Sequence, residues 1–518
     1  MHVLFAAAEL APLIKVGGLG EAACGLVRSL RRAGHRVDVI VPDYGPSPLE
    51  LDPTPPRPVP VPAWAGPATV RRFTLDGLGP VHALDVVGMA RRHPYVHPDT
   101  GEGWADNDRR FFAFSQAVAA LAEERRPDVV HLNDWHTATA LAALDPAMPT
   151  VFTIHNLAYQ GWADEGWLVA LGPRGEAFRH GGACNPMAGA IRLAGRIVAV
   201  SPTYAAEIGR PEHAEGLDEL LEAARDRLTG IRNGIDTERW NPATDRYLPA
   251  AYTAAELAGR EVCGRSLRRL AGFPDDHEPI IGVVARLVEQ KGIDVALDLV
   301  PLLANLPARM VLVGDGEARL VELARALAER HPDRVFVSPY RDELAHLVAA
   351  GSDLMLVPSR FEPCGLTQME AMAYGSIPVV NGVGGLRDTV IDADAEPDRG
   401  NGFLAHRPGP LHLLDAVHRA LRAHRNDQRR RTLQQRAMRS DWSWTEPAAA
   451  YASTYRAVSD RAVSDGGACS PAPDASSAAI SVSDQPISLS TSAVCSPSRG
   501  ALRNNPVGDE LKLVASRT

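Results

Sequence analysis

Apolar runs alternate with helix-like patterns through the first half of the chain. Residues 2–10 form an apolar run typical of a strand, residues 21–34 repeat apolar positions at helical spacing, and residues 37–44 form a second apolar run. This order predicts a βαβ unit, which requires a parallel sheet. Further apolar runs extend the predicted sheet at 81–87, 129–132, 150–155 and 196–200. The pattern predicts one doubly wound α/β domain over residues 1–245, with the Pro-rich stretch 53–67 on its surface.

A second alternating series begins near residue 280. Apolar runs predict strands at 280–287, 310–316, 335–340, 353–359 and 377–382, and helical patterns occupy 292–306 and 318–331. The series predicts a second α/β domain over residues 246–440, with the linker to the first domain at 241–252.

The pattern changes again after the second domain. Residues 441–458 form an amphipathic stretch that predicts a helix. Ser, Ala, Pro and Asp dominate residues 459–518, where no periodicity is visible. Because such a segment buries too little apolar surface to offset its chain entropy, we expect a disordered tail.

Composition excludes several classes of protein. The formal net charge of -9 argues against a general nucleic-acid binder, which usually presents a basic face. No apolar run is long enough to span a membrane, and the N-terminus lacks the basic segment of a signal peptide. The six cysteines include no CxxC pair, so no zinc signature is visible. These features together predict a soluble, cytoplasmic protein.

The loop between the first strand and the first helix is rich in glycine. Lys15 is followed by Gly17, Gly18 and Gly20, so backbone N–H groups can approach an anion closely while the lysine pairs with it. The loop is neither a Walker A motif nor G-x-G-x-x-G. The alternative interpretation is a tight turn with a solvated lysine.

Two cations follow the first strand of the second domain. Arg286 and Lys291 lie where this strand gives way to a helix. Open α/β sheets bind ligands at the carboxyl ends of their strands, and two cations there suit a diphosphate. The alternative is a pair of surface cations in a loop.

A dense polar segment follows the strand at 353–359. Glu362 lies in the loop after this strand, and Glu370 lies inside the next helix. The Glu362 carboxylate in the loop can accept hydrogen bonds from sugar hydroxyls, and the Glu370 carboxylate can hold the two hydroxyls of a ribose. The backbone N–H groups of Gly365, Leu366 and Thr367 would face a ligand above the helix. The alternative is a capping loop with unrelated surface glutamates.

Histidines follow two further strands of the first domain. His155 and Asn156 come after the run 150–155 and could hold hydroxyl groups, although a lone histidine is more often structural. His131, Asp134 and His136 are conceivable metal ligands. Because no second ligand cluster accompanies them, we predict no metal site.

Seven motifs in matching order resemble the glycogen/starch synthase family of bacteria and plastids. They are KVGGLG, NDWHTA, HNLAYQG, RNGIDTERWNP, ARLVEQKGID, RFEPCGLTQMEAMAYG and GGLRDTV. The resemblance implies a GT-B fold, in which two Rossmann-like, doubly wound domains face a central cleft. It implies retaining transfer of glucose from ADP-glucose to the non-reducing end of an α-1,4-glucan, without a cofactor. It also implies that the helix at 441–458 crosses back onto the first domain.

The resemblance assigns roles residue by residue. Its catalytic set is Lys15, His155, Arg286, Lys291 and Glu362, where the cations bind the donor diphosphate, Glu362 holds glucose hydroxyls and His155 lies near the C6 hydroxyl. The donor-binding set adds Gly17, Gly18, Asn233, Gln290, Cys364, Gly365, Leu366, Thr367 and Glu370, the last for the ribose. The acceptor side is formed by Tyr95, Asp134 and Asn156. No second carboxylate accompanies Glu362 as a nucleophile, so the implied reaction proceeds on one face of the sugar.

One position departs from the family pattern. Where a small residue and Asp usually follow the KVGGL motif, this chain has Gly20 and Glu21. The longer side chain bears on donor preference, so UDP- and GDP-glucose stay open as donors. A small sugar or sugar phosphate stays open as the acceptor, as does a non-catalytic homologue, although no key residue is missing. A glucan phosphorylase is disfavoured because no motif indicates a lysine for pyridoxal phosphate.

Overall fold

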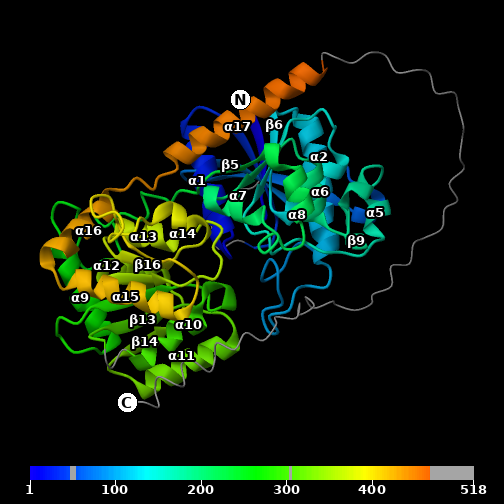
Figure 1. Cartoon of the computed structure of the whole chain (residues 1–518). Helices are drawn as coiled ribbons and strands as arrows, with labels where there is room; N and C mark the ends of the chain where they lie inside the picture. The colour runs from blue at the N-terminus through cyan, green and yellow to red at the C-terminus, as the bar shows by residue number, and fades with distance from the viewer. Residues whose placement is uncertain (47–53, 303–305, 467–518) are drawn as a thin grey trace, which may run out of the picture.

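The computed structural model describes residues 1–46, 54–302 and 306–466 and contains two large sheets (Figure 1). The first sheet has the order β11-β10-β7-β6-β1-β2-β5-β4-β3. Its strands are β1 (His2–Ala6), β2 (Arg36–Pro42), β3 (Arg57–Pro58), β4 (Ala68–Leu75), β5 (Gly79–Val86), β6 (Val129–Asn133), β7 (Thr150–Ile154), β10 (Arg196–Ala199) and β11 (Leu228–Gly230). All neighbours are parallel except at the β3-β4-β5 edge.

The second sheet is parallel throughout, with the order β14-β13-β12-β15-β16-β17. Its strands are β12 (Ile280–Val284), β13 (Arg309–Val313), β14 (Val335–Ser338), β15 (Leu354–Val357), β16 (Ile377–Asn381) and β17 (Phe403–Ala405). Numbered from β12, this is the 3-2-1-4-5-6 order of the Rossmann fold.

Helices cover both faces of each sheet (Figure 1). Those of the first half are α1 (Gly18–Arg32), α2 (Asn107–Arg125), α3 (Trp135–Ala138), α4 (Ala140–Ala143), α5 (Trp167–Ala170), α6 (Pro186–Leu193), α7 (Pro202–Ile208) and α8 (Asp218–Ala223). Those of the second half are α9 (Ala258–Ala271), α10 (Ile293–Asp298), α11 (Ala318–Arg330), α12 (Asp342–Gly351), α13 (Thr367–Ala373), α14 (Gly384–Thr389), α15 (Pro410–His424) and α16 (Asp427–Arg439).

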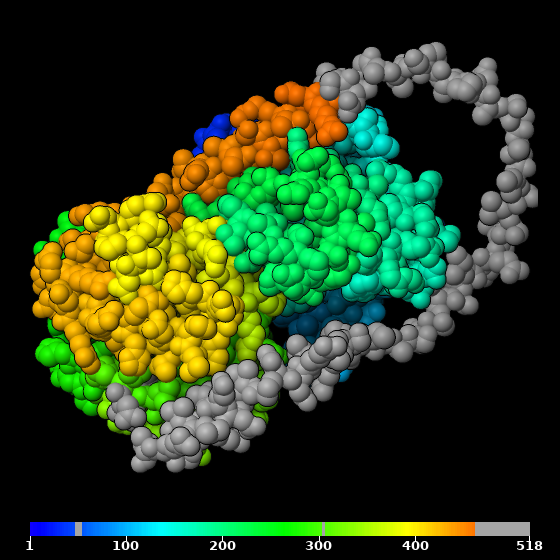
Figure 2. Space-filling model, viewed as in Figure 1, coloured from blue at the N-terminus to red at the C-terminus, as the bar shows by residue number. Residues whose placement is uncertain are grey.

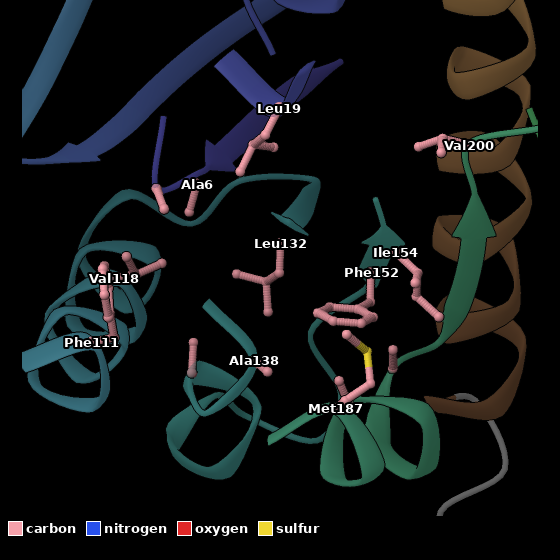
Figure 3. Close-up of a cluster of buried hydrophobic side chains, with 14 of the residues drawn as sticks. Ala6, Leu19, Phe111, Val118, Leu132, Ala138, Phe152, Ile154, Met187 and Val200 are labelled. Atoms are coloured by element: carbon pink, nitrogen blue, oxygen red, sulfur yellow. The ribbon is translucent and has the colours of Figure 1, made fainter. Parts of the chain in front are cut away.

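Strands buried on both faces explain the unbroken apolar runs of the sequence. Leu4 and Ala6 of β1 pack into one core, whereas Val3 and Phe5 pack into the core on the opposite face. Figure 3 shows the first core, in which side chains of α2, α3 and α6 meet those of β6 and β7. The predicted doubly wound class is confirmed.

The last described helix, α17 (Thr445–Gly466), returns to the first sheet (Figure 1). Tyr451 and Tyr455 are buried in the core on the α1 face. Trp444 packs so closely on α1 that a Cβ added to Gly25 would lie 2.0 Å from its indole nitrogen. The helix ends at Gly466, eight residues after the predicted end at residue 458. Residues 467–518 of the predicted tail lie outside the described residues.

Four strands of the two large sheets, β3, β4, β11 and β17, were not predicted, and one predicted helix is shorter than expected. Residues 68–75 are half-buried, not continuously apolar, and form β4, which pairs with β5 on one side and with the two-residue strand β3 on the other. The helix predicted over 292–306 ends at Asp298 and is followed by a 3-10 turn at Val300–Leu302, because Pro301 has no N–H to continue the helix. Its last predicted residues, 303–305, lie outside the described residues.

The predicted linker is ordered and partly buried. Tyr252 is buried, and Asp245 accepts hydrogen bonds from His346 Nδ1 and Tyr374 Oη, each at 2.6 Å. The domain boundaries at residues 245, 440 and 458 stay a prediction. No helix of the described ranges combines the length and apolarity needed to cross a membrane.

Candidate active site

The polar loops of both sheets lie at the carboxyl ends of their strands and face one another. In the first sheet, the loops after β1 and β6 flank the point where the strand order reverses, as do the loops after β12 and β15 in the second. Ligands of open α/β sheets bind at such points. A Cβ added to Gly18 would lie 3.7 Å from Leu366 Cδ1, so the two sets of loops approach closely. Figure 2 shows the two halves of the molecule in contact.

A buried carboxylate that the sequence analysis missed holds the glycine-rich loop. Glu9 Oε2 accepts hydrogen bonds from the N–H groups of Val16 (2.7 Å) and Gly17 (3.0 Å). Its Oε1 accepts one from Tyr95 Oη at 2.7 Å. Glu9 therefore links this loop to Tyr95, which is predicted to bind the acceptor. The Gly17 N–H group already donates its hydrogen bond to Glu9. The sequence feature that could have indicated this role is the position of Glu9, a carboxylate at the end of an apolar run.

Lys15 spans the cleft from this loop. Its Nζ pairs with Glu21 at 2.6 Å and lies 6.0 Å from the ring centre of Tyr340, which belongs to the second half of the chain. The carboxylate that departs from the family pattern is thus the direct partner of a predicted catalytic cation.

Asp134 and His155 form one hydrogen-bonded unit after β6 and β7. The His155 N–H donates to Asp134 Oδ1 at 2.7 Å, and His155 Nε2 lies 3.0 Å from Asn133 Oδ1. Because Asn133 Nδ2 donates to the Ala6 carbonyl, its Oδ1 accepts, so His155 carries its proton on Nε2. Burial lowers the pKa of His155 to about 3 and raises that of Asp134 to about 7.

The conceivable metal ligands point to different surroundings. His131 lies in the core, where its nitrogens contact Tyr455 Oη (2.8 Å) and Thr153 Oγ1 (2.7 Å). His136 packs against Tyr95, with ring centres 5.0 Å apart. Among the described residues, no group of three or more His, Cys, Asp or Glu side chains could hold a metal ion. Asn156 caps its own turn through the Ala158 N–H.

Glu362 is held in place by two donors in the second half. Lys291 Nζ lies 2.5 Å from its Oε2, and Ser359 Oγ donates to the same oxygen at 2.9 Å. Glu362 is buried, whereas Arg286 is exposed, and the Arg286 side chain has no hydrogen bond or ion pair with any residue of the described ranges. Gln290 joins the same group of loops through the Phe361 carbonyl, at 3.4 Å.

The segment after Glu362 is shaped by backbone geometry. Gly365 has a φ of +71°, and a Cβ there would lie 2.5 Å from Gln368 Oε1. Burial raises the pKa of the Cys364 thiol to about 12, so this thiol is neutral and not a thiolate nucleophile. Thr367 Oγ1 contacts the Val284 carbonyl at 3.4 Å, and Asn233 is buried beside Cys364.

Glu370 lies in an acidic and basic cluster that spans both halves. Burial, reinforced by the nearby Glu21, raises the pKa of Glu370 to about 8, while Lys15 and Arg239 act in the opposite direction. Glu21, Arg239, Leu366 and Glu370 line a cavity of about 50 Å³. Arg239 was not predicted from the sequence, because its proximity to Glu370 depends on how the two halves pack.

Comparison with known proteins gives consistent matches over most of the chain. Residues 2–223 match the family model of the starch synthase catalytic domain, and residues 269–439 match glycosyl transferases group 1. A glycogen synthase of Anaeromyxobacter sp. (strain Fw109-5) is 41% identical over 481 residues, which cover 88% of this chain and 99% of the relative. One of Halorhodospira halophila is 42% identical over 479 residues, with the same shares of both chains.

Solved structures show the same architecture. The catalytic domain of starch synthase IV from Arabidopsis thaliana, bound to ADP and acarbose, has a TM-score of 0.82 and 32% identity, covering 89% of this chain and 99% of that one. A sucrose-phosphate synthase from Thermosynechococcus elongatus has a TM-score of 0.58 at 19% identity over the same shares, which indicates a common fold.

Proposed function

Because the chain belongs to the glycogen synthase family of glycosyltransferases, we propose that it transfers glucose from ADP-glucose to the non-reducing end of an α-1,4-glucan, with retention of configuration. One observation carries the proposal. The Lys15 loop of the first sheet faces the Glu362–Leu366 loop of the second, with Gly18 against Leu366. Cations of both halves thus border one cleft. The starch synthase IV neighbour was solved with ADP and acarbose, which supports these ligand classes.

The donor diphosphate would lie between the two halves. The Arg286 guanidinium is exposed and unpaired among the described residues, so it can offer a forked pair of donors. Lys291 and Lys15 would add point charges from opposite sides. Glu370, deeper in the cleft, would bind the ribose hydroxyls, and a protonated Glu370 could donate as well as accept.

The glucosyl unit would be held by residues that are already oriented. Glu362 is fixed by Lys291 and Ser359, so it can accept hydrogen bonds from sugar hydroxyls without being free to attack the anomeric carbon. His155, neutral and protonated on Nε2, would present Nδ1 as an acceptor to the sugar. Asn233, Gln290 and the segment from Cys364 to Thr367 would line this pocket.

In the proposed reaction the bond between the anomeric carbon and the diphosphate oxygen breaks as the acceptor hydroxyl attacks from the same face. The acceptor proton passes to the departing phosphate oxygen, and ADP leaves. Arg286, Lys291 and Lys15 stabilise the charge that develops on the diphosphate, which is where fixed cations lower a barrier most effectively. Tyr95, Asp134 and Asn156 would position the acceptor.

A donor and acceptor panel tests the proposal. The purified chain is incubated with ADP-, UDP- or GDP-glucose and with glycogen, maltotriose or glucose 6-phosphate, and products are identified by mass spectrometry and α-1,4-specific digestion. We expect glycogen to be elongated from ADP-glucose. Incorporation only into the phosphorylated monosaccharide would refute the polymer acceptor, and no incorporation from any donor would refute the transferase.

A further inference from the structure

Two large aromatic side chains are exposed beyond the predicted acceptor loop. Tyr159 is 53% exposed and Trp162 is 52% exposed. They follow His155 and Asn156 in one segment after β7. Two large exposed aromatic groups three residues apart in one segment favour a binding surface over a solvated face.

The backbone that carries them is firmly anchored. Gln160, between the two, is buried; its Nε2 donates to the Glu215 carbonyl (2.9 Å) and its Oε1 accepts from Asn185 Nδ2 (2.7 Å). Ala163 exchanges two backbone hydrogen bonds with Cys184. Because the segment is already ordered, a ligand that binds to it pays little entropy to fix the backbone.

The same segment packs against the acceptor side of the site. Gly161 has a φ of +74°, and a Cβ there would lie 2.3 Å from the Trp135 ring. Trp135 directly follows Asp134 in the chain. The exposed pair is therefore continuous with the residues proposed to position the acceptor.

The Trp162 ring is supported from one side. Its edge lies 3.4 Å from a Cβ added to Gly181, and its centre is 5.7 Å from that of the His180 ring, which is tilted by 36°. The His180 ring is itself hydrogen-bonded, through Nε2, to the Gly216 carbonyl at 3.0 Å. The Trp162 ring is therefore held in a fixed orientation, and about half of the residue stays exposed to solvent.

We propose that Tyr159 and Trp162 form a glucan platform, a surface that binds the acceptor polysaccharide outside the reaction centre. Sugar rings have apolar C–H faces that pack on aromatic rings, and the Tyr hydroxyl and the Trp N–H can bond to sugar hydroxyls. The neighbouring Asp164 is exposed, and the Glu165 carboxylate is paired with Arg179, so this surface carries no excess of positive charge for an anionic ligand and suits a neutral polysaccharide. The platform depends on the proposed function, because it assumes a glucan acceptor.

The test uses the full chain and five variants. They are Tyr159→Ala, Trp162→Ala, the double variant, Trp162→Phe, and the control Val169→Ala, which removes an apolar side chain that is 79% exposed. Migration in native gels with and without glycogen reports binding without turnover. The KM for glycogen and the KM for ADP-glucose are measured separately, and light scattering gives the mass of each variant.

We expect the double variant to lose most of its retardation by glycogen and to raise the KM for glycogen on the order of tenfold, since aromatic anchors dominate binding surfaces. The KM for ADP-glucose stays unchanged, and Trp162→Phe keeps most of the retardation. Tyr159→Ala tests the platform even if Trp162→Ala fails to fold.

Two outcomes overturn the platform. One is a double variant that is retarded as strongly as Val169→Ala, and the other is a change of mass without a change in glycogen binding, which would make this surface a contact between copies. A wild-type chain that is retarded by glycogen but transfers no glucose would contradict the proposed function and leave the platform standing.

Discussion

At the residue scale, the use of lysine is uneven. Of the 54 Lys and Arg residues in the sequence, three are lysines, namely Lys15, Lys291 and Lys512. Lys15 and Lys291 both lie in loops after strands, and both pair with a carboxylate, Glu21 and Glu362 respectively. A chain that otherwise uses arginine thus places a compact ammonium at two points of the proposed diphosphate site.

Lys291→Arg should reduce turnover although it keeps the positive charge. The guanidinium is planar and longer, so it would displace Glu362 from its present position although the charge is kept. We expect kcat to fall on the order of 10²-fold, because small displacements at a reacting centre are costly. The matched control is the reverse exchange at an exposed position, Arg325→Lys, which should leave kcat unchanged. A Lys291→Arg variant with wild-type kcat would show that only the charge matters.

Buried neutral histidines form a second group at this scale. Burial lowers the pKa of both His131 and His136 to about 3, whereas the unfolded chain gives each about 6.5. Between these values the unfolded chain binds protons that the folded chain does not. Their contribution to stability is therefore complete above pH 6.5 and is lost as the pH falls toward 3.

His136→Gln should weaken this acid sensitivity. We expect the wild-type free energy of unfolding to fall from pH 7.0 to pH 5.0 by about 2 kcal/mol more than that of the variant. Urea denaturation at both pH values measures the difference, and His412→Gln, an exposed histidine, is the control. Equal falls in all three proteins would mean that His136 is protonated in the folded state.

At the element scale, α17 depends on a glycine of α1. The Trp444 indole occupies the space where a side chain at position 25 would lie, and Tyr451 and Tyr455 bury their rings behind it. The Tyr455 hydroxyl lies 2.8 Å from His131 Nδ1 of β6, which joins the helix to the sheet. This packing explains why a helix late in the sequence belongs to the first sheet.

Gly25→Ala should displace this helix. The added methyl group would overlap the indole, so we expect destabilisation of about 1–3 kcal/mol, as for overpacked cores, seen as a lower melting temperature. Gly264→Ala in α9 is the control, because its Cβ would meet only the Gly351 carbonyl, at 3.4 Å, and helix propensity favours alanine. Equal melting temperatures for Gly25→Ala and the wild type would argue against close packing of Trp444.

At the scale of the whole molecule, the two halves are joined by α7 and α14. Asp388 accepts hydrogen bonds from the N–H (2.9 Å) and Oγ1 (2.6 Å) of Thr203. The Glu207 carboxylate accepts from the Gly384 N–H, and Ser201 Oγ donates to the Pro363 carbonyl at 2.6 Å. Carboxylates that face helix N-termini from opposite halves hold the two halves together.

Asp388→Ala should weaken the coupling between the halves. Removing an ionised acceptor costs about 1.5–3 kcal/mol, so we expect calorimetry to show two separated unfolding transitions where the wild type shows closer ones. Asp398→Ala, an exposed aspartate, is the control and should unfold like the wild type. Superimposable traces for all three proteins would show that this contact contributes nothing to the coupling.

Local sequence pattern was enough to predict the class of fold and the sheet edges at which we place the proposed site. Alternating apolar runs and helical patterns require parallel sheets, whose strand exits share one edge, so the loops of Lys15, Arg286 and Glu362 could be placed without coordinates. The sequence also predicted a helix after residue 440, although not its end at Gly466, and it did not predict the half-buried strand β4.

Which of these residues lie in contact could be read only from the three-dimensional packing. Glu9 holds the Gly17 amide and Tyr95 together across a long stretch of sequence, and Arg239 reaches the surroundings of Glu370 through the packing of the two halves. Periodicity reports which face of an element is buried, but not which distant side chain lies against it. Hydrogen-bond partners and pKa shifts therefore followed from the packing of whole sheets and not from local pattern.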